Sequence, residues 1–211
     1  MDTPLDARRV RNPGQTREKI LDAAQVLILD HGFSATTVDA VVGRAGITKG
    51  AFFHHFPSKS DLGRALVERH AATDREHFLA QLARAEKLAA DPLQQVLLLI
   101  GFYEEEFDAM EEPYPGCLFA SYIYEHKLFD DGTLEILKDA ALFWRAQMKA
   151  KLEQVMAAYP PNRAVELDSL SDLFYSITEG AFVMTKTLGD KTMLSRQTKH
   201  LRTYLELLFA K

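Results

Sequence analysis

The sequence predicts an all-α protein with about nine helices. Apolar residues recur at the spacing of one helical face in segment after segment, and short breaks rich in Pro, Gly and Asp separate these segments. No stretch alternates apolar and polar residues for long enough to form a strand. The 211 residues, of which 47% are hydrophobic and 26% charged, suit one large or two small globular domains with an ordinary core.

The first helix is expected after Pro13, with Thr16 as a possible N-cap. Ile20 and Ala24 begin an apolar stripe at helical spacing, and Gly32 is expected to end the helix.

Two short helices joined by a tight turn follow. Thr36 and Thr37 can cap the second helix, and Thr48 can cap the third, which is expected over residues 49–56. Between them, Gly46 can adopt the left-handed backbone conformation that lets a chain reverse within a few residues. Residues from about 36 to 55 therefore have the build of a helix-turn-helix, whose second helix enters the major groove of DNA.

Six further helices are expected after this segment. Ser58 and Asp61 resemble a capping pair that opens a long fourth helix through Leu82, and Asp91 followed by Pro92 opens the fifth. The remaining four are expected over residues 117–126, 133–159, about 164–188 and 193–210.

The formal charge of −5 is unevenly distributed. Residues 1–60 hold eight Lys and Arg against six Asp and Glu, a balance of +2, whereas residues 61–211 hold seventeen against twenty-four, a balance of −7. Arg8, Arg9 and Arg11 lie in residues 1–13, which show no apolar periodicity and are expected to form a flexible basic arm. Only the N-terminal segment is therefore expected to face a phosphate backbone.

Cysteine content and hydropathy favour the cytoplasm. The single cysteine, Cys117, excludes an internal disulfide framework, and the first residues lack the apolar run of a secretion signal. The longest apolar stretch, residues 96–101, is far shorter than the roughly 20 residues of a membrane-spanning helix. We expect a soluble cytoplasmic protein with no membrane partner.

One set of residues between positions 16 and 62 carries a family pattern: Ile20, Ala24, Gly32-Phe33, Thr36-Thr37-Val38, Ala45-Gly46-Ile47-Thr48-Lys49-Gly50, Phe52-Phe53-His54-His55-Phe56 and Lys59-Ser60-Asp61-Leu62. With these residues the segment closely resembles the DNA-binding domain of TetR-type repressors. Phe53 departs from the pattern, because the family usually has Tyr there, and one hydroxyl that could bond a phosphate is lost.

The resemblance implies a transcriptional repressor that a small organic effector releases from its operator. Its parts would be the basic arm (1–13), a DNA-binding domain (14–74) and an effector-binding and dimerisation domain (75–211). Beyond the helix-turn-helix, the likeness is one of architecture. A homodimer would present two third helices about 34–36 Å apart, so we expect a palindromic operator in double-stranded DNA.

The resemblance also implies roles for individual residues. Thr37 and Thr48 would bond phosphates, Lys49, Gly50 and His54 would face the groove, and His55 and Lys59 would contact the DNA backbone, with Thr36, Ala51 and Phe53 completing the set. His54 could instead be a solvated surface residue. The three aromatic residues Phe33, Phe52 and Phe56 are expected in the core.

The last two long helices are implied to pair with their twins as a four-helix dimer interface. The residues that would supply small and apolar surface are Leu173, Ser176, Ile177, Gly180, Phe182, Leu201, Leu205 and Leu208. Ordinary core packing explains the same residues almost as well.

An effector pocket is expected among the helices between residues 92 and 188, which are rich in aromatic residues. Its candidate lining is Phe102, Tyr103, Cys117, Phe119, Tyr122, Phe143, Trp144, Phe174, Tyr175, Ala181 and Phe182. An aromatic stripe is often core, so about half of the aromatic candidates are expected to touch a ligand. Cys117 could be a thiol sensor, but no cation neighbours it in sequence, which favours an inert buried cysteine.

Two alternatives are a small all-α enzyme and a protein-binding scaffold with a non-functional helix-turn-helix. The Glu104-Glu105-Glu106 run and the Glu125-His126 pair lack the partners of a catalytic or metal site, and the glutamate run is expected to be a solvated face. His70 and His77 share a helix face but would lie about 10 Å apart along the axis, too far for one metal ion. We expect no catalysis, cofactor or metal.

Overall fold

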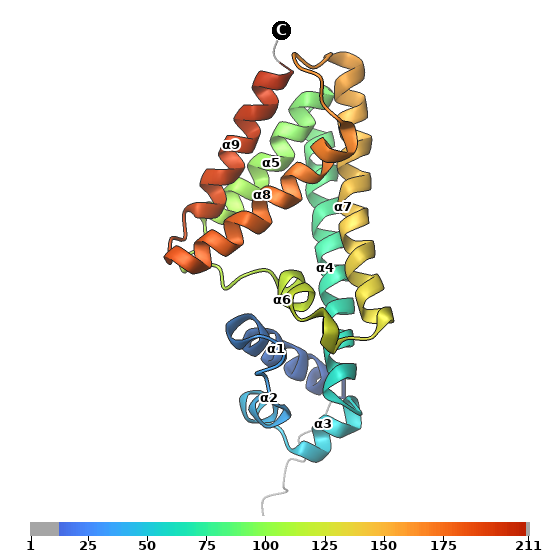
Figure 1. Cartoon of the computed structure of the whole chain (residues 1–211), viewed down its shortest axis with the longest axis vertical. Coiled ribbons are helices and arrows are strands. Elements are labelled where there is room, and N and C mark those ends of the chain that lie inside the picture. The colour runs from blue at the N-terminus through green and yellow to red at the C-terminus, as the bar shows by residue number, and fades with distance from the viewer. Residues whose placement is uncertain (1–12, 210–211) are drawn as a thin grey trace, which may run out of the picture. The chain divides into compact units, whose positions relative to one another are not determined.

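The computed structural model describes residues 13–209, which form nine α-helices and one short 3-10 helix and contain no strand (Figure 1). The elements are α1 (Pro13–His31), α2 (Val38–Ala45), α3 (Lys49–His55), α4 (Lys59–Leu88), α5 (Pro92–Asp108), α6 (Leu118–Tyr124), η1 (His126–Leu128), α7 (Asp131–Ala158), α8 (Leu167–Leu188) and α9 (Met193–Leu208). The all-α prediction is confirmed. The expected arm at residues 1–13 lies almost entirely outside the described residues.

The chain divides into two compact units, Met1–Leu66 and Val67–Lys211. The first contains α1, α2, α3 and the start of α4, and the second contains the rest of α4 and all later helices. No helix within the described residues has the length and apolar composition needed to cross a membrane.

The first unit has its own core. Ile20, Leu21, Ala24 and Ile28 form the buried stripe of α1 and are at most 1% exposed. The helix begins at Pro13, so the prediction of Thr16 as its cap is wrong. Proline is favoured at the first helical position because its φ is already helical and its missing N–H would have had no helical partner.

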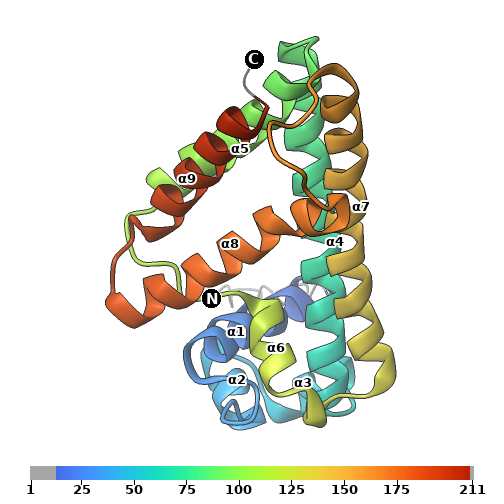
Figure 2. The same ribbon diagram turned by 45° about the horizontal axis from the view of Figure 1, so that its top comes forward.

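The second unit is a helical bundle. In Figures 1 and 2, α5 runs beside α9, and α4 runs beside α7, while α8 packs against both α7 and α9. Its most buried side chains include residues of α4, α5, α7 and α9 that are at most 1% exposed, namely Phe78, Val96, Ile100, Leu152, Val155 and Leu194.

Side-chain caps explain where two of its helices begin. Asp130 accepts a hydrogen bond from the amide of Thr133 at 2.7 Å, so α7 starts two residues before the predicted position. Glu166 accepts hydrogen bonds from two amides at 2.6 and 2.9 Å and opens α8 at Leu167, three residues later than predicted. The predicted helix over 117–126 is shorter, because α6 ends at Tyr124 and η1 follows.

The glutamate run in α5 is not the solvated face that the sequence predicts. Glu104 is only 5% exposed and lies 3.4 Å from the guanidinium of Arg202 on α9. Glu106 accepts a hydrogen bond from Gln81 at 2.5 Å and lies 2.9 Å from the His77 ring. Of the three, only Glu105 is exposed, because neighbouring helices cover the other two.

Candidate functional site

The turn between α2 and α3 has the geometry of a helix-turn-helix. Gly46 adopts φ 64° and ψ 39°, the left-handed conformation predicted for it, and its amide bonds the carbonyl oxygen of Gly43 at 3.3 Å. The next amide, of Ile47, bonds the carbonyl oxygen of Val42 at 3.2 Å. These bonds occupy carbonyl groups that the end of α2 would otherwise leave without partners.

Threonine caps begin both helices. The Thr37 hydroxyl oxygen accepts a hydrogen bond from the amide of Ala40 at 3.1 Å, and the Thr48 hydroxyl oxygen accepts one from Ala51 at 3.2 Å. Both threonines are exposed. Because a hydroxyl that accepts a bond still has its own proton to donate, capping is compatible with the phosphate contacts expected of both residues.

One face of α3 anchors the helix and the other is open. Phe52 and Phe56 are 0% and 3% exposed, with ring centroids 6.0 Å apart, and Phe33 is 4% exposed, so the core prediction for all three is confirmed. The residues of α3 that are not buried are Lys49, Gly50, Ala51, Phe53, His54 and His55. Phe53 is 49% exposed, so its ring lies on the open face of the helix.

Two residues of the expected DNA-binding set have other partners. Thr36 is only 3% exposed, and its hydroxyl donates to the carbonyl oxygen of Gly32 at 2.8 Å. This placement argues against a phosphate contact and gives Thr36 a role in closing the end of α1. The Lys59 ammonium donates to the carbonyl oxygen of Ser34 at 3.2 Å and lies 4.3 Å from the centre of the Phe33 ring, so Lys59 also holds the unit together.

Lys49 forms an ion pair across the helix-turn-helix. Its ammonium lies 2.7 Å from a carboxylate oxygen of Asp39 on α2, and both side chains are more than half exposed. Exposed pairs of this kind contribute little to stability, so the ammonium can exchange the carboxylate for a phosphate at small cost.

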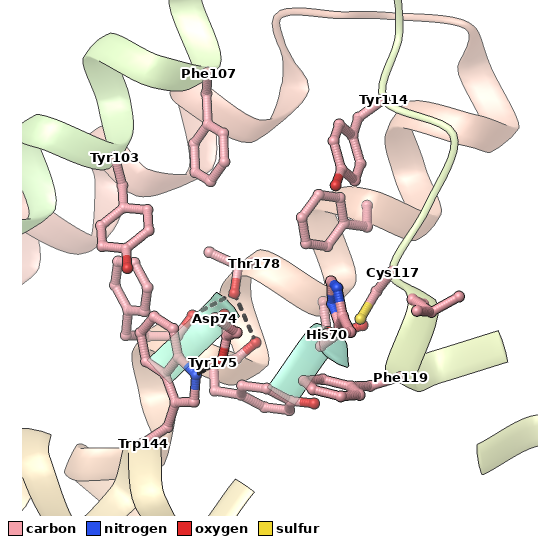
Figure 3. Close-up of a pocket in the computed structure, with 14 residues that line it drawn as sticks. His70, Asp74, Tyr103, Phe107, Tyr114, Cys117, Phe119, Trp144, Tyr175 and Thr178 are labelled. Carbon is pink, nitrogen blue, oxygen red and sulfur yellow. Dashed lines mark hydrogen bonds between the residues drawn. The ribbon is translucent and has the colours of Figure 1, made fainter. Parts of the chain in front are cut away.

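The second unit contains a cavity of about 140 Å³. The helices α4, α5, α6, α7 and α8 and the loop before α6 contribute to it, as Figure 3 shows. Its lining consists of His70, Asp74, Tyr103, Phe107, Tyr114, Cys117, Leu118, Phe119, Trp144, Phe174, Tyr175, Thr178, Glu179 and Phe182.

Seven of the eleven predicted pocket residues line this cavity: Tyr103, Cys117, Phe119, Trp144, Phe174, Tyr175 and Phe182. The other four do not. Phe102 lies under the Arg84 guanidinium, and Phe143 under that of Arg75. Tyr122 is fully buried and stacks on Phe129 at 4.4 Å, and Ala181 is buried in the core of the second unit.

Seven lining residues were not predicted: His70, Asp74, Phe107, Tyr114, Leu118, Thr178 and Glu179. His70 and Asp74 are four residues apart on α4, a spacing that places them on one helix face. The spacing of these two polar residues could have been recognised in the sequence. They were not predicted because the pocket was expected only among the aromatic-rich helices after residue 92, and α4 lies before them.

Aromatic rings form most of the cavity wall. The Trp144 and Phe174 rings are stacked at 5.5 Å with an angle of 9°, and Tyr103 meets Phe174 at 5.2 Å. On the other side, Tyr114 and Phe182 are 4.9 Å apart. The indole nitrogen of Trp144 donates to Asp74 at 2.6 Å and thereby ties α7 to α4.

Burial controls the protonation of the polar lining. Desolvation, with the nearby charge of Arg69, lowers the pKa of His70 to about 4, so the ring is neutral at neutral pH. Burial raises the pKa of both Asp74 and Glu179. Burial and the Glu179 carboxylate also raise the pKa of Cys117, which keeps the thiol protonated and disfavours the thiol-sensor alternative.

The predicted dimer surface is partly core. Leu201, Leu205 and Leu208 are 2%, 2% and 5% exposed and pack inside their own unit, so they are not available to a second copy. In contrast, α8 and α9 expose other apolar residues, namely Val183, Met184, Leu188, Tyr204 and Leu207. Gly180 and Ser176 are also exposed on α8, and no atom lies within 4 Å of where a Cβ of Gly180 would be.

Metal chemistry finds no support in the described part of the chain. Within residues 13–209, no group of three or more His, Cys, Asp and Glu side chains is placed to hold a metal ion.

Comparison with known proteins finds a family match in the N-terminal part of the chain. Residues 20–66 match the tetR family of bacterial regulatory proteins. The chain is 29% identical over 186 residues to the uncharacterized HTH-type transcriptional regulator YxaF of Bacillus subtilis (strain 168), covering 86% of this chain and 90% of the relative. It is 32% identical over 111 residues to the probable acrEF/envCD operon repressor of Escherichia coli (strain K12), covering 44% and 50% of the two chains.

A solved structure agrees over nearly the whole chain. The TetR-family transcriptional regulator from Agrobacterium tumefaciens superposes with a TM-score of 0.75 and 26% identity, covering 94% of this chain and 100% of the other. These regulators are not enzymes, so the prediction of a regulator over a small all-α enzyme is confirmed. The capped helix-turn-helix, the family match and this structural likeness agree: residues 20–66 are a DNA-binding domain of the tetR family, and the chain has the fold of the bacterial transcriptional regulators of that family.

Proposed function

We propose that the protein is a repressor whose homodimer binds a palindromic operator through α3 and leaves it when a small organic molecule fills the cavity of the second unit. The observation that carries the DNA part is the open face of α3, which projects from a capped helix-turn-helix while Phe52 and Phe56 hold its other face. The proposal places the protein in the cytoplasm, where bacterial operator DNA lies.

We assign DNA binding to the first unit and ligand binding and dimerisation to the second. The proposed boundary moves from residue 74 to Leu66, because His70 and Asp74 line the cavity. α4 crosses this boundary as one unbroken helix, with Lys59 at its start. A ligand that contacts α4 can favour one position of this helix over another, and such coupling typically amounts to about 1–3 kcal/mol.

Replacing Lys49 with Ala is expected to weaken operator binding. The variant loses one ammonium from each α3, so the dependence of log K on log salt should become shallower by about 0.9 for each phosphate that is no longer neutralised. Fluorescence anisotropy with DNA from upstream of the gene, measured at several salt concentrations, gives both quantities. Lys49 is preferred to Lys59 for this test because Lys59 also bonds the Ser34 carbonyl.

Lys138→Ala is the matched control, since Lys138 is an exposed lysine of α7 paired with Glu135. It removes the same charge from the second unit and should leave the affinity and the salt slope unchanged. A folded Lys49→Ala protein that binds as tightly as the parent at every salt concentration contradicts the recognition role. A parent protein that shows no preference for any upstream sequence favours the scaffold alternative.

Dimerisation is proposed to use the exposed apolar face of α8 and α9. Met184→Glu and Leu207→Glu place charges on that face, so together they should raise the dimer dissociation constant by at least tenfold while the helical content stays unchanged. Sedimentation velocity at micromolar concentration measures the change. Leu88→Glu alters an equally exposed leucine at the end of α4 and should leave the dimer intact.

Leu205→Glu distinguishes a core residue of α9 from a residue of the dimer interface. Leu205 is 2% exposed within the monomer, so a carboxylate there should unfold the second unit and not simply split the dimer. A parent protein that is monomeric at micromolar concentration would refute the dimer proposal.

A further inference from the structure

The cavity in the second unit contains acidic side chains but no Lys or Arg to pair with them. Asp74 and Glu179 both line it, whereas its lining contains no Lys or Arg. The one basic side chain in the lining is His70, whose pKa is lowered to about 4 and whose ring is therefore neutral at neutral pH. Two acidic groups thus share a small, largely apolar space without an opposite charge.

Neither acid forms an ion pair with Lys or Arg among the described residues, and the charge of the nearby His77, which is not part of the lining, offsets only part of the effect of burial on the pKa of Asp74. Asp74 accepts its hydrogen bond from the neutral indole of Trp144, and Glu179 interacts with the thiol of Cys117. Burial raises the pKa of both carboxyl groups because their charged forms are poorly solvated there. A bound cation would supply the missing counter-charge and stabilise the ionised forms.

The aromatic wall suits the same kind of ligand. Trp144, Phe174 and Tyr103 pack against one another on one side of the cavity, and Phe182 packs against Phe107 on another. The face of an aromatic ring carries partial negative charge and attracts organic cations, most strongly where water is excluded. The rings and the carboxylates therefore favour the same sign of ligand charge.

The Tyr103 hydroxyl is a further point of recognition. Tyr103 is 7% exposed, and its hydroxyl oxygen is buried without a hydrogen-bond partner in the described part of the chain. In Figure 3 this hydroxyl points toward the side of the cavity that holds Trp144 and Asp74. A buried hydroxyl without a partner is costly, so a ligand group that bonds it there would be stabilised.

The volume limits the size of the ligand. The cavity of about 140 Å³ is close to the roughly 150 Å³ of an apolar cavity that holds one benzene molecule. One ring with a short substituent fits this space.

We propose that the effector of this protein is a small aromatic organic cation, with one ring held between the aromatic walls and an ammonium group held by Asp74 and Glu179. This inference rests on the proposed function, because it names the chemical class of the ligand for the same cavity. A neutral aromatic molecule and an aromatic carboxylate are the competing classes.

The test compares ligands of one shape and three charges on the full-length protein. The probes are 2-phenylethylammonium, 2-phenylethanol and phenylacetate. The chain has a single tryptophan, and Trp144 lines the cavity, so its fluorescence reports binding at this site directly. We expect the ammonium to bind at least tenfold more tightly than the alcohol, and phenylacetate to bind most weakly.

Isosteric variants test the two carboxylates. Asp74→Asn keeps an oxygen that can accept the Trp144 hydrogen bond, and Glu179→Gln keeps the side-chain length. Each should weaken binding of the ammonium by about tenfold and leave binding of 2-phenylethanol almost unchanged. Glu153→Gln, at an exposed position of α7, is the control and should change neither.

Operator binding without ligand is measured on the same samples, which separates this inference from the proposed function. If the alcohol or phenylacetate binds as tightly as the ammonium, or if Asp74→Asn with Glu179→Gln leaves the preference intact, the cation assignment is overturned while operator binding still supports a repressor. If none of the three probes binds, the assignment of a one-ring cation is equally overturned. Absence of operator binding contradicts the repressor whatever the ligands do.

Discussion

Gly50→Ala is expected to weaken operator binding by about fivefold or more while stabilising the protein itself. Gly50 is exposed on α3 and its φ is not in the left-handed region, so no backbone requirement selects glycine. A Cβ there would meet only the Thr48 hydroxyl oxygen at 3.9 Å, an ordinary contact. Alanine should raise the free energy of unfolding by roughly 0.5 kcal/mol because it loses less backbone entropy on folding.

The opposite signs make this substitution informative. A methyl group on the α3 surface would press against DNA that approaches closely, and overpacking of this kind typically costs about 1–3 kcal/mol. Thermal unfolding and anisotropy with the operator measure the two effects. Gly101→Ala, at a helical position of α5 in the second unit, should alter stability alone. If Gly50→Ala binds the operator like the parent, α3 does not make the close approach that we propose.

Thr178→Phe is expected to abolish the effector response. Thr178 lines the cavity from α8, and its hydroxyl bonds only the helix carbonyls of Phe174 and Tyr175. A phenyl ring at this position would occupy a cavity of about 140 Å³ that has room for little more than one ring. The affinity for any ligand of that size should fall at least tenfold, measured by Trp144 fluorescence and by release of operator DNA.

Thr178→Val is the matched control, because it removes the hydroxyl without filling the space and should retain most of the response. Tyr122→Phe serves as a second control. The sequence predicts Tyr122 in the pocket, but it stacks on Phe129 and does not line the cavity, so its change should leave the ligand affinity unaltered. A Thr178→Phe protein that folds and responds at the parent's ligand concentration would show that the effector binds elsewhere.

The helix-turn-helix could be predicted from the sequence almost residue by residue. The caps at Thr37 and Thr48 and the left-handed Gly46 each depend on groups within four positions along the chain. The same holds for Ser58. Its hydroxyl oxygen accepts a hydrogen bond from the Asp61 amide at 3.1 Å, and its hydroxyl group donates one to the Asp61 carboxylate at 2.7 Å. Features of this range are visible in the sequence because both partners of each bond appear in one short window.

The cavity could be predicted only in part. Aromatic content located the right helices, but Phe102 and Phe143 turn toward Arg84 and Arg75, and nothing in their spacing distinguishes them from Tyr103 and Trp144. The sequence also does not predict the burial of Glu104, because its partner Arg202 lies almost a hundred positions away. Each outcome depends on which face of a helix its neighbours cover.

Local backbone bonds and helical periodicity decide the all-α class, the extent of most helices and the capped turn that presents α3, so these features follow from the sequence alone. The packing of the second unit was needed to show that Leu205 is core while Leu207 is surface, and that α4 brings His70 and Asp74 into the aromatic cavity. These features differ because burial depends on side chains from distant segments. The two carboxylates face an apolar space without a cation because five helices and a loop close around them, and no single window of sequence contains that enclosure.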